Sequence, residues 1–214
     1  MIDLHTHTLL SDGALLPTEL MVRAMATGYR ALAITDHVDD SNLEEVVTKL
    51  LEVKASHGWD GFTLIAGVEL THIKPERIAS LTERARGLGA GLVVCHGETL
   101  VEPVPAGTNL AAIEAGVDIL AHPGLVTEQE CRLAARKGVF FEVSGRKGHS
   151  LANGHVVKMA RRFGVGLVFN TDAHAPSDLV TEEMATKILK GAGLTDEECE
   201  KVWQNARSLV ERAR

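Results

Sequence analysis

Short apolar segments recur along this chain, and segments with helix start and stop signals separate them. Most of the apolar segments are near-continuous hydrophobic runs, which are typical of parallel strands buried on both faces. Strands that alternate with helices indicate βα units and a parallel sheet. The predicted strands are residues 2–4, 31–35, 63–68, 91–95, 118–121, 139–143 and 166–170.

Local signals place helices between these strands. Pro17 is predicted to begin the first helix, and glycines at 58, 89, 116, 138 and 164 stand where other helices should stop. Capping-box spacing occurs in three pairs, Ser41 with Glu44, Thr127 with Glu130, and Thr195 with Glu198. The last pair is predicted to begin a helix that continues to the C-terminus.

Seven βα units favour a closed or nearly closed barrel over an open sheet. A doubly wound sheet stays open as an alternative, although no glycine-rich dinucleotide loop follows the first strand. The chain has 214 residues, of which 45% are hydrophobic and 24% charged, so we expect one domain over residues 1–214. The predicted fold class is therefore α/β.

Composition limits the cellular setting and the partners. No apolar run approaches the roughly 20 residues of a membrane span, and the N-terminus lacks a signal-peptide pattern. The three cysteines are widely spaced, which fits a reducing compartment, so we expect a cytoplasmic protein. A net charge of −7 makes nucleic acid an unfavoured partner.

Metal-ligating side chains follow six of the seven predicted strands. The carboxyl ends of parallel barrel strands meet at one rim, so side chains distant in sequence converge there. His5 and His7 are one residue apart and point to the same face of an extended segment. The predicted set is His5, His7, Asp12, His37, Glu69, His96, His122, Asp172 and His174.

One histidine near a strand end is more often a hydrogen-bonded structural side chain than a ligand. Six of the ten histidines lie there, however, and chance rarely produces that placement. Six imidazoles and three carboxylates exceed the ligands of one tetrahedral ion, so two or three divalent ions are expected. Glu69 and Asp172 are the natural bridges, and the nitrogen and oxygen ligands suit zinc, manganese or iron.

The motifs DLHTHTLLSDG, ITDH, GVE, CHGE, AHP and NTDAH together resemble those of the PHP (polymerase and histidinol phosphatase) superfamily. They run in order from residue 3 to residue 174. The resemblance implies a distorted (β/α)7 TIM-like barrel with a trinuclear metal centre at its C-terminal rim, and hydrolysis of phosphoesters.

The resemblance also implies how the ligands divide among the ions. The first ion would take His5, His7, Glu69 and Asp172, the second Glu69, His96 and His122, and the third Asp12, His37 and His174. Asp12 is the loosest match, because some members have a histidine near that point.

A metal-activated hydroxide at such a di- or trinuclear centre hydrolyses an ester in one step. Asp12, His37 and His174 are the candidates for protonating the leaving group. The glycine-rich segment after the sixth strand offers anion-binding groups for the substrate. These predicted substrate-binding residues are Arg146, Lys147, His149 and Ser150.

The leading hypothesis is a phosphatase for a small phosphorylated substrate, with histidinol phosphate as one candidate. The alternatives are a phosphodiesterase or nuclease, a metal-dependent amidohydrolase, and a non-catalytic metal-binding module. The oligomeric state stays open, because the apolar face of the last helix, residues 202–209, can pack on the barrel or on a second subunit.

Overall fold

The computed structural model describes residues 1–213, and a parallel sheet forms its centre. The sheet order is β1-β2-β4-β5-β6-β7-β8, with β3 paired to β4. All seven predicted strands are present, each within two residues of its predicted bounds. The strands are β1 (Ile2–Asp3), β2 (Ala31–Ile34), β3 (His37–Val38), β4 (Thr63–Leu70), β5 (Leu92–His96), β6 (Ile119–Ala121), β7 (Phe140–Ser144) and β8 (Leu167–Asn170).

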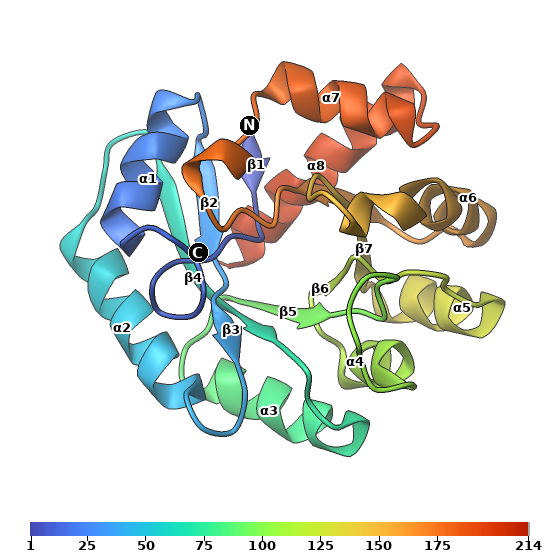
Figure 1. Cartoon of the computed structure of the whole chain (residues 1–214), viewed down its shortest axis with the longest axis horizontal. Coiled ribbons are helices and arrows are strands. Elements are labelled where there is room, and N and C mark those ends of the chain that lie inside the picture. Colours follow the sequence, from blue (N-terminus) through green and yellow to red (C-terminus); the bar gives the residue numbers. More distant parts are fainter. Residues whose placement is uncertain (214) are drawn as a thin grey trace.

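Helices surround the strands, as Figure 1 shows. They are α1 (Pro17–Ala26), α2 (Leu43–Ser56), α3 (Pro75–Gly87), α4 (Thr108–Ala115), α5 (Glu128–Lys137), α6 (Asn153–Phe163), α7 (Glu182–Gly191) and α8 (Asp196–Arg212). Two 3-10 turns, η1 (His149–Ala152) and η2 (Pro176–Asp178), follow β7 and β8. None of the helices in residues 1–213 combines the length and the apolar character needed to cross a bilayer.

Strand β3 continues β2 after a two-residue interruption. Both strands pair in parallel with β4: Ile34 lies opposite Ala66, and His37 lies opposite Glu69. The eight strands therefore occupy seven positions around the sheet, as the seven predicted βα units require. Because β3 extends the strand position of β2, His37 lies at the carboxyl end of that position.

Among the described residues, main-chain pairing between the first and last strands lies just beyond their carboxyl ends. Thr6 forms a parallel bridge with Ala173, and the His7 amide donates to the Ala173 carbonyl at 2.9 Å. At the last residue of β1, the buried Asp3 carboxylate accepts hydrogen bonds from the amide and hydroxyl of Thr171, at 3.2 and 2.6 Å. The sheet is thus a nearly closed, TIM-like α/β barrel, which confirms the predicted fold class.

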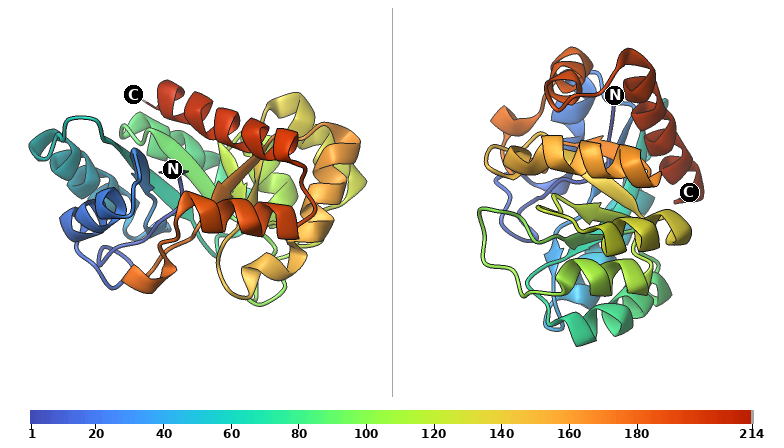
Figure 2. Two further views of the ribbon diagram at one scale, coloured as in Figure 1. Left: turned by 90° about the horizontal axis from the view of Figure 1, so that it is seen from above. Right: turned by 90° about the vertical axis from the view of Figure 1, so that its right-hand side faces the viewer.

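Each face of the sheet has its own apolar cluster. Alternate strand residues such as Leu32 pack outward against the surrounding helices, while Ala33 and Val94 belong to an inner cluster. Helix α8 closes this inner cluster with Leu209 and Val210. Figure 2 shows α8 on the side of the barrel opposite η2. The apolar face of the last helix therefore packs on the barrel of its own chain.

The helix termini follow the predicted signals with one exception. The capping boxes of Thr127 with Glu130 and of Thr195 with Glu198 are both formed. The predicted box of Ser41 with Glu44 is wrong, because α2 begins at Leu43. The Asp39 carboxylate instead accepts from the Ser41 amide and hydroxyl, at 2.7 and 2.6 Å. Local hydrogen bonding by Asp39 outcompetes the cap.

Candidate metal centre

The nine predicted ligands come together at the carboxyl ends of the strands. Their ligand atoms fall into overlapping groups, and within each group the atoms lie within 4.8 Å of one another. The groups are His5, His7 and Asp172; His5, Glu69 and His122; His7, Asp12, His37 and His174; and His96, His122 and His149. Strand geometry thus gathers residues 5 to 174 into one polar cluster.

Glu69 and Asp172 occupy the middle of this cluster. The two carboxylate oxygens of Glu69 lie 3.2 Å from His5 Nε2 and 2.7 Å from His37 Nδ1. Asp172 Oδ1 lies 3.2 Å from His7 Nε2 and 3.7 Å from His5 Nε2. Asp172 Oδ2 lies 3.7 Å from His122 Nε2, so the two oxygens of each carboxylate face different histidines, as they do in a bridging ligand.

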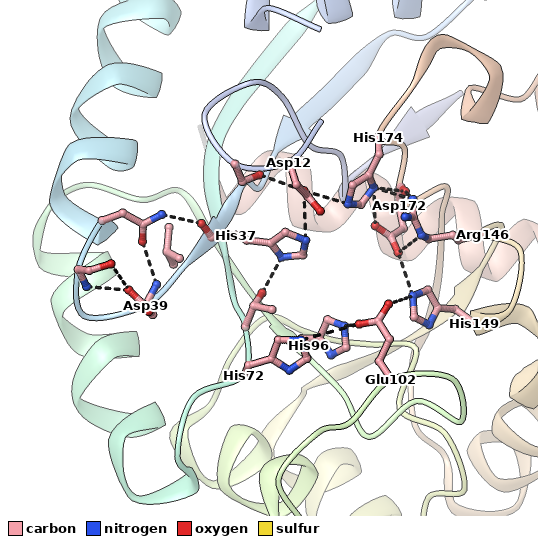
Figure 3. Close-up of a pocket in the computed structure, with 15 residues that line it drawn as sticks. Asp12, His37, Asp39, His72, His96, Glu102, Arg146, His149, Asp172 and His174 are labelled. Atoms are coloured by element: carbon pink, nitrogen blue, oxygen red, sulfur yellow. Dashed lines mark hydrogen bonds and ion pairs between the residues drawn. The ribbon is translucent and has the colours of Figure 1, made fainter. Parts of the chain in front are cut away.

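Asp12, His37 and His174 form the outer edge of the cluster. Asp12 Oδ1 lies 3.4 Å from His37 Nε2 and 3.1 Å from His174 Nε2, and the Asp12 side chain is 59% exposed. Figure 3 shows the three side chains pointing toward one another across the mouth of the pocket. This part of the cluster is open to solvent, whereas His5, His7 and Glu69 are fully enclosed.

The backbone is strained at two of the gathered residues. His122 and Asp172 have φ angles of 28° and 53°, in the left-handed region that side-chain-bearing residues seldom adopt. Such strain persists only where the surrounding structure enforces it, and it concentrates at functional sites.

Several buried polar atoms of the cluster make no hydrogen bond within the described residues. They include His5 Nε2, both ring nitrogens of His7, Glu69 Oε1 and His122 Nδ1. Burying such atoms without a partner is costly. Divalent cations would satisfy them, and the nitrogen and oxygen donor set fits zinc, manganese or iron. The residues present therefore fit a metal centre.

Electrostatics favours ligation at two of the histidines. Burial, together with the charges of neighbouring histidines, holds the pKa of His7 and of His122 well below the ordinary value. Both rings are therefore neutral at pH 7, which is the form that binds metals. Burial also raises the pKa of Asp172 to about 7, with Glu69 and Glu142 adding to the rise.

A family model for the PHP domain matches residues 3–139. The chain belongs to the PHP domain family. Over 201 residues, which are 92% of each chain, it is 47% identical to an uncharacterized protein of Methanocaldococcus jannaschii. It is also 27% identical over 225 residues to a probable phosphatase of Thermoanaerobacter, covering 92% of this chain and 88% of the relative.

Solved structures share the fold of this PHP protein. One is a histidinol phosphate phosphatase of Lactococcus lactis complexed with zinc, L-histidinol and phosphate, with a TM-score of 0.62 and 16% identity over 91% and 94% of the two chains. Another is a chain in an archaeal ribonuclease P structure with mature tRNA, with a TM-score of 0.74 and 17% identity over 100% and 91% of the chains. The family and the phosphatase-named relatives support a phosphoesterase enzyme.

The structure adds Glu142, which the sequence analysis missed. Its carboxylate is fully buried, and Oε2 lies 2.8 Å from His5 Nδ1 and accepts from Asn170 Nδ2 at 2.9 Å. A carboxylate behind a metal-ligating histidine fixes the ring orientation and tautomer. The signal in the sequence was an acidic residue inside the apolar strand FFEVS, because an acidic side chain is almost never fully buried unless it is paired.

Glu102 is the second missed residue. It lies in the segment after β5, and its carboxylate is 38% exposed. Its two oxygens lie 3.0 Å from His96 Nε2 and 3.4 Å from His149 Nε2. No motif marks Glu102 in the sequence, because only the path of this segment brings it over the cluster.

The predicted substrate-binding residues occupy different places. Arg146 lines the pocket, with Nε 3.6 Å from Asp172 Oδ2 and Nη1 2.6 Å from His174 Nδ1. Lys147 is exposed and lines a neighbouring hollow. Ser150 donates its amide to the Arg146 carbonyl at 3.1 Å and is absent from the lining of the main pocket. His149 is buried within the ligand cluster.

Proposed function

We propose that this PHP protein is a metal-dependent phosphatase that hydrolyses a small phosphate monoester, with histidinol phosphate as one candidate. The observation that carries the proposal is the enclosed histidine and carboxylate cluster, with Arg146 beside it in the same pocket. Arg146 is the one Lys or Arg among the described residues that line this pocket. A guanidinium beside metal ligands suits a phosphoryl group.

Two or three divalent ions, when bound, would supply an activated water and stabilise charge on the phosphoryl oxygens. Glu69 and Asp172 would hold neighbouring ions, because each contacts two histidines. Arg146 would bind a non-bridging phosphoryl oxygen. Asp12 and His174 contact each other at the solvent-facing edge. Where they do not hold an ion, these two side chains would be placed to give a proton to the departing alkoxide, and His37 is the third candidate.

The pocket favours a small substrate. Its volume is about 510 Å³, within the range of small-molecule sites. Asp12, Asp39 and Glu102 in its lining disfavour a polyanion such as DNA or RNA. Carboxylates, rather than a lysine, lie at the bridging positions, which speaks against an amidohydrolase. Intact packing of all nine predicted ligands speaks against a module that has lost catalysis.

The test measures metal content per chain together with hydrolysis of a panel of phosphate mono- and diesters that includes histidinol phosphate. We expect two or three ions, turnover that a chelator abolishes, and faster hydrolysis of monoesters. His7→Ala should abolish turnover. Arg146→Ala should raise KM about 10- to 100-fold, because it removes a charge-assisted hydrogen bond. Lys158→Ala, an exposed cation on α6, is the matched control.

Other outcomes point to the alternatives. Hydrolysis of diesters or RNA in preference to monoesters would favour a phosphodiesterase or nuclease, and cleavage of amides would favour an amidohydrolase. Bound ions without any turnover would favour a non-catalytic module. Each of these results contradicts the proposed phosphatase.

A further inference from the structure

We propose that His149 is a tenth protein ligand of the metal centre, and that it completes an all-protein cation position with Glu69, His96 and His122. The proposal rests on the metal-dependent function proposed above. It replaces the substrate-binding role that the sequence suggested for His149.

The position of the His149 ring supports ligation. The ring is buried beside His122, with centroids 4.0 Å apart, and the two rings must tilt from their interplanar angle of 16° for both to reach one ion. The His149 ring also meets His96 nearly at a right angle, with centroids 5.9 Å apart. One ligand atom from each of the three histidines lies within 4.8 Å of the others. Small side-chain adjustments bring three such nitrogens to about 2.1 Å from one zinc ion.

Hydrogen bonds aim the same nitrogen of both rings at one point. His149 Nδ1 lies 2.7 Å from Thr99 Oγ1, so an Nδ1–H that donates to this hydroxyl leaves the Nε2 lone pair free. His96 Nδ1 lies 3.1 Å from the Gly97 carbonyl, which selects the same tautomer. The two Nε2 atoms converge, because the single carboxylate of Glu102 contacts both. Figure 3 shows Glu102 between the two rings.

The backbone around His149 is built to hold this position. Gly148, directly before it, has a φ of 94°, and a Cβ there would lie 3.4 Å from a Val101 methyl group. The segment that carries Thr99 and Val101 therefore packs closely against η1. This packing orients the His149 ring before any ion binds. Binding an ion therefore costs little additional conformational entropy.

The fourth ligand changes the character of this cation position. Glu69, His96, His122 and His149 would fill a tetrahedral zinc site, and closed sites of this kind hold their ion tightly. The position formed by Asp12, His37 and His174 is exposed on one side and leaves room for water or substrate. We therefore expect one ion that is retained and at least one that exchanges readily.

The experiment measures zinc per chain after dialysis of the full-length protein against graded concentrations of a chelator. Wild-type protein should keep one ion after the others have been removed. His149→Ala should lose this retained ion, with its affinity reduced by at least about 100-fold. His155→Ala is the matched control, because His155 lies in α6 and its Nε2 donates to the Val126 carbonyl. The control should retain the ion as wild-type protein does.

Two further variants keep the test decisive if His149→Ala folds poorly. Thr99→Val keeps the imidazole but removes its hydrogen-bond partner, and should lower the affinity for the retained ion about 10-fold or more. His149→Asp supplies another ligand and should restore much of the retention. Cobalt-substituted protein gives a spectroscopic readout, since loss of a ligand changes the visible absorption of a tetrahedral site.

The result that overturns the proposal is a wild-type zinc retention profile in His149→Ala and in Thr99→Val, whatever happens to KM. Failure of the proposed function looks different. A wild-type protein that retains zinc through His149 but hydrolyses no phosphoester would contradict the phosphatase and leave the ligand assignment standing. A wild-type protein that binds no ion would overturn both.

Discussion

At the scale of single residues, the centre depends on side chains that touch the ligands as much as on the ligands themselves. Glu142 contacts His5, Thr99 contacts His149, and the Asp36 carboxylate accepts from the amide and hydroxyl of Thr8, both at 2.7 Å. Asp36 also accepts from the Ser11 hydroxyl at 2.6 Å, which fixes the loop that carries Asp12. These partners decide whether the ligands are held in place before a metal binds.

Replacing Glu142 by glutamine should weaken metal binding. His5 and Asn170 both contact one carboxylate oxygen, Oε2, and a neutral amide oxygen at that place accepts more weakly, so it holds the His5 ring less firmly in one tautomer. We expect the metal dissociation constant to rise about 10- to 100-fold, measured by competition with a chelator. Glu76→Gln, at an exposed position in the first turn of α3, is the control and should bind metal with wild-type affinity. Unchanged affinity in Glu142→Gln would show that Glu142 serves only packing.

Gly124 should tolerate no side chain. It lies two residues after His122, with a φ of 65°, and a Cβ there would lie 1.9 Å from the Glu98 carbonyl oxygen. Gly116 has a similar φ of 72°, but a Cβ there would meet no atom within 4 Å. Gly116→Ala should therefore lower the free energy of unfolding by about 1–2 kcal/mol, the cost of the left-handed backbone alone.

Gly124→Ala adds a backbone collision to the same conformational cost. We expect it to lower the free energy of unfolding by at least about 2 kcal/mol more than Gly116→Ala does. Urea denaturation of the two variants measures the difference. Equal destabilisation would mean that the segment after β6 moves aside at little cost.

At the scale of elements, six of the seven strand positions deliver metal-ligating side chains where they end, and helices such as α4 and α5 end at glycines in the left-handed conformation. In β4 and β5 the inner face changes from apolar residues to Glu69 and His96 at the carboxyl end. The same alternation places Glu142 of β7 on the inner face. An element thus contributes to the core over its first residues and to the metal centre with its last.

The stabilisation that Glu198 contributes at the N-terminus of α8 should depend on pH. Its carboxylate accepts from Arg161 Nε and Nη2, at 2.7 and 2.8 Å, and from the Thr195 amide at 2.8 Å. These hydrogen bonds lower the pKa of Glu198 from 4.5 to about 2. Because the folded pKa is depressed, the stabilisation is fully present above pH 4.5 and is lost as the pH falls toward 2.

Glu198→Gln should therefore lower the free energy of unfolding by about 1 kcal/mol at pH 7, and by progressively less below pH 4.5. Urea denaturation at pH 7 and at pH 3 measures the change. Glu197→Gln, in the same first turn of α8, is the control and should show a smaller effect at pH 7. A difference between wild type and Glu198→Gln that grows on acidification would contradict the assigned sign.

At the scale of the whole molecule, the metal centre joins the two ends of the barrel sheet. His5 and His7 follow β1, Asp172 and His174 follow β8, and main-chain pairing between these strands is confined to their carboxyl ends. Ions shared by these residues would therefore strengthen the connection between the first and last strands, which main-chain pairing joins at this end alone among the described residues.

Metal binding should stabilise the entire fold. At a free zinc concentration of a thousand times the dissociation constant, each ion that binds only the folded state adds about 4 kcal/mol. For a chain of this size we expect a rise in Tm of about 10 °C per ion, measured by calorimetry with zinc and with a chelator. His7→Ala should show a smaller rise. Equal Tm values with zinc and with the chelator would exclude tight binding.

The sequence alone was sufficient for those features that depend on near neighbours in the chain. Continuous apolar runs marked the strands, and glycines such as Gly116 and Gly138 marked helix ends, because left-handed caps are a local requirement. Parallel βα order then required His5 and His174 to share one rim, 169 positions apart in the chain. Nine predicted ligands consequently lie together.

Only the tertiary structure decided how residues on different elements face one another. Asp39 took the hydrogen bonds of Ser41, and Glu142 reached His5 because strand register aligned two residues distant in sequence. The segment after β5 that carries Thr99 and Val101 packs against η1, and this packing directs His149 into the cluster. These outcomes depend on register, loop path and competition for hydrogen bonds, which the folded chain settles collectively and no local pattern encodes.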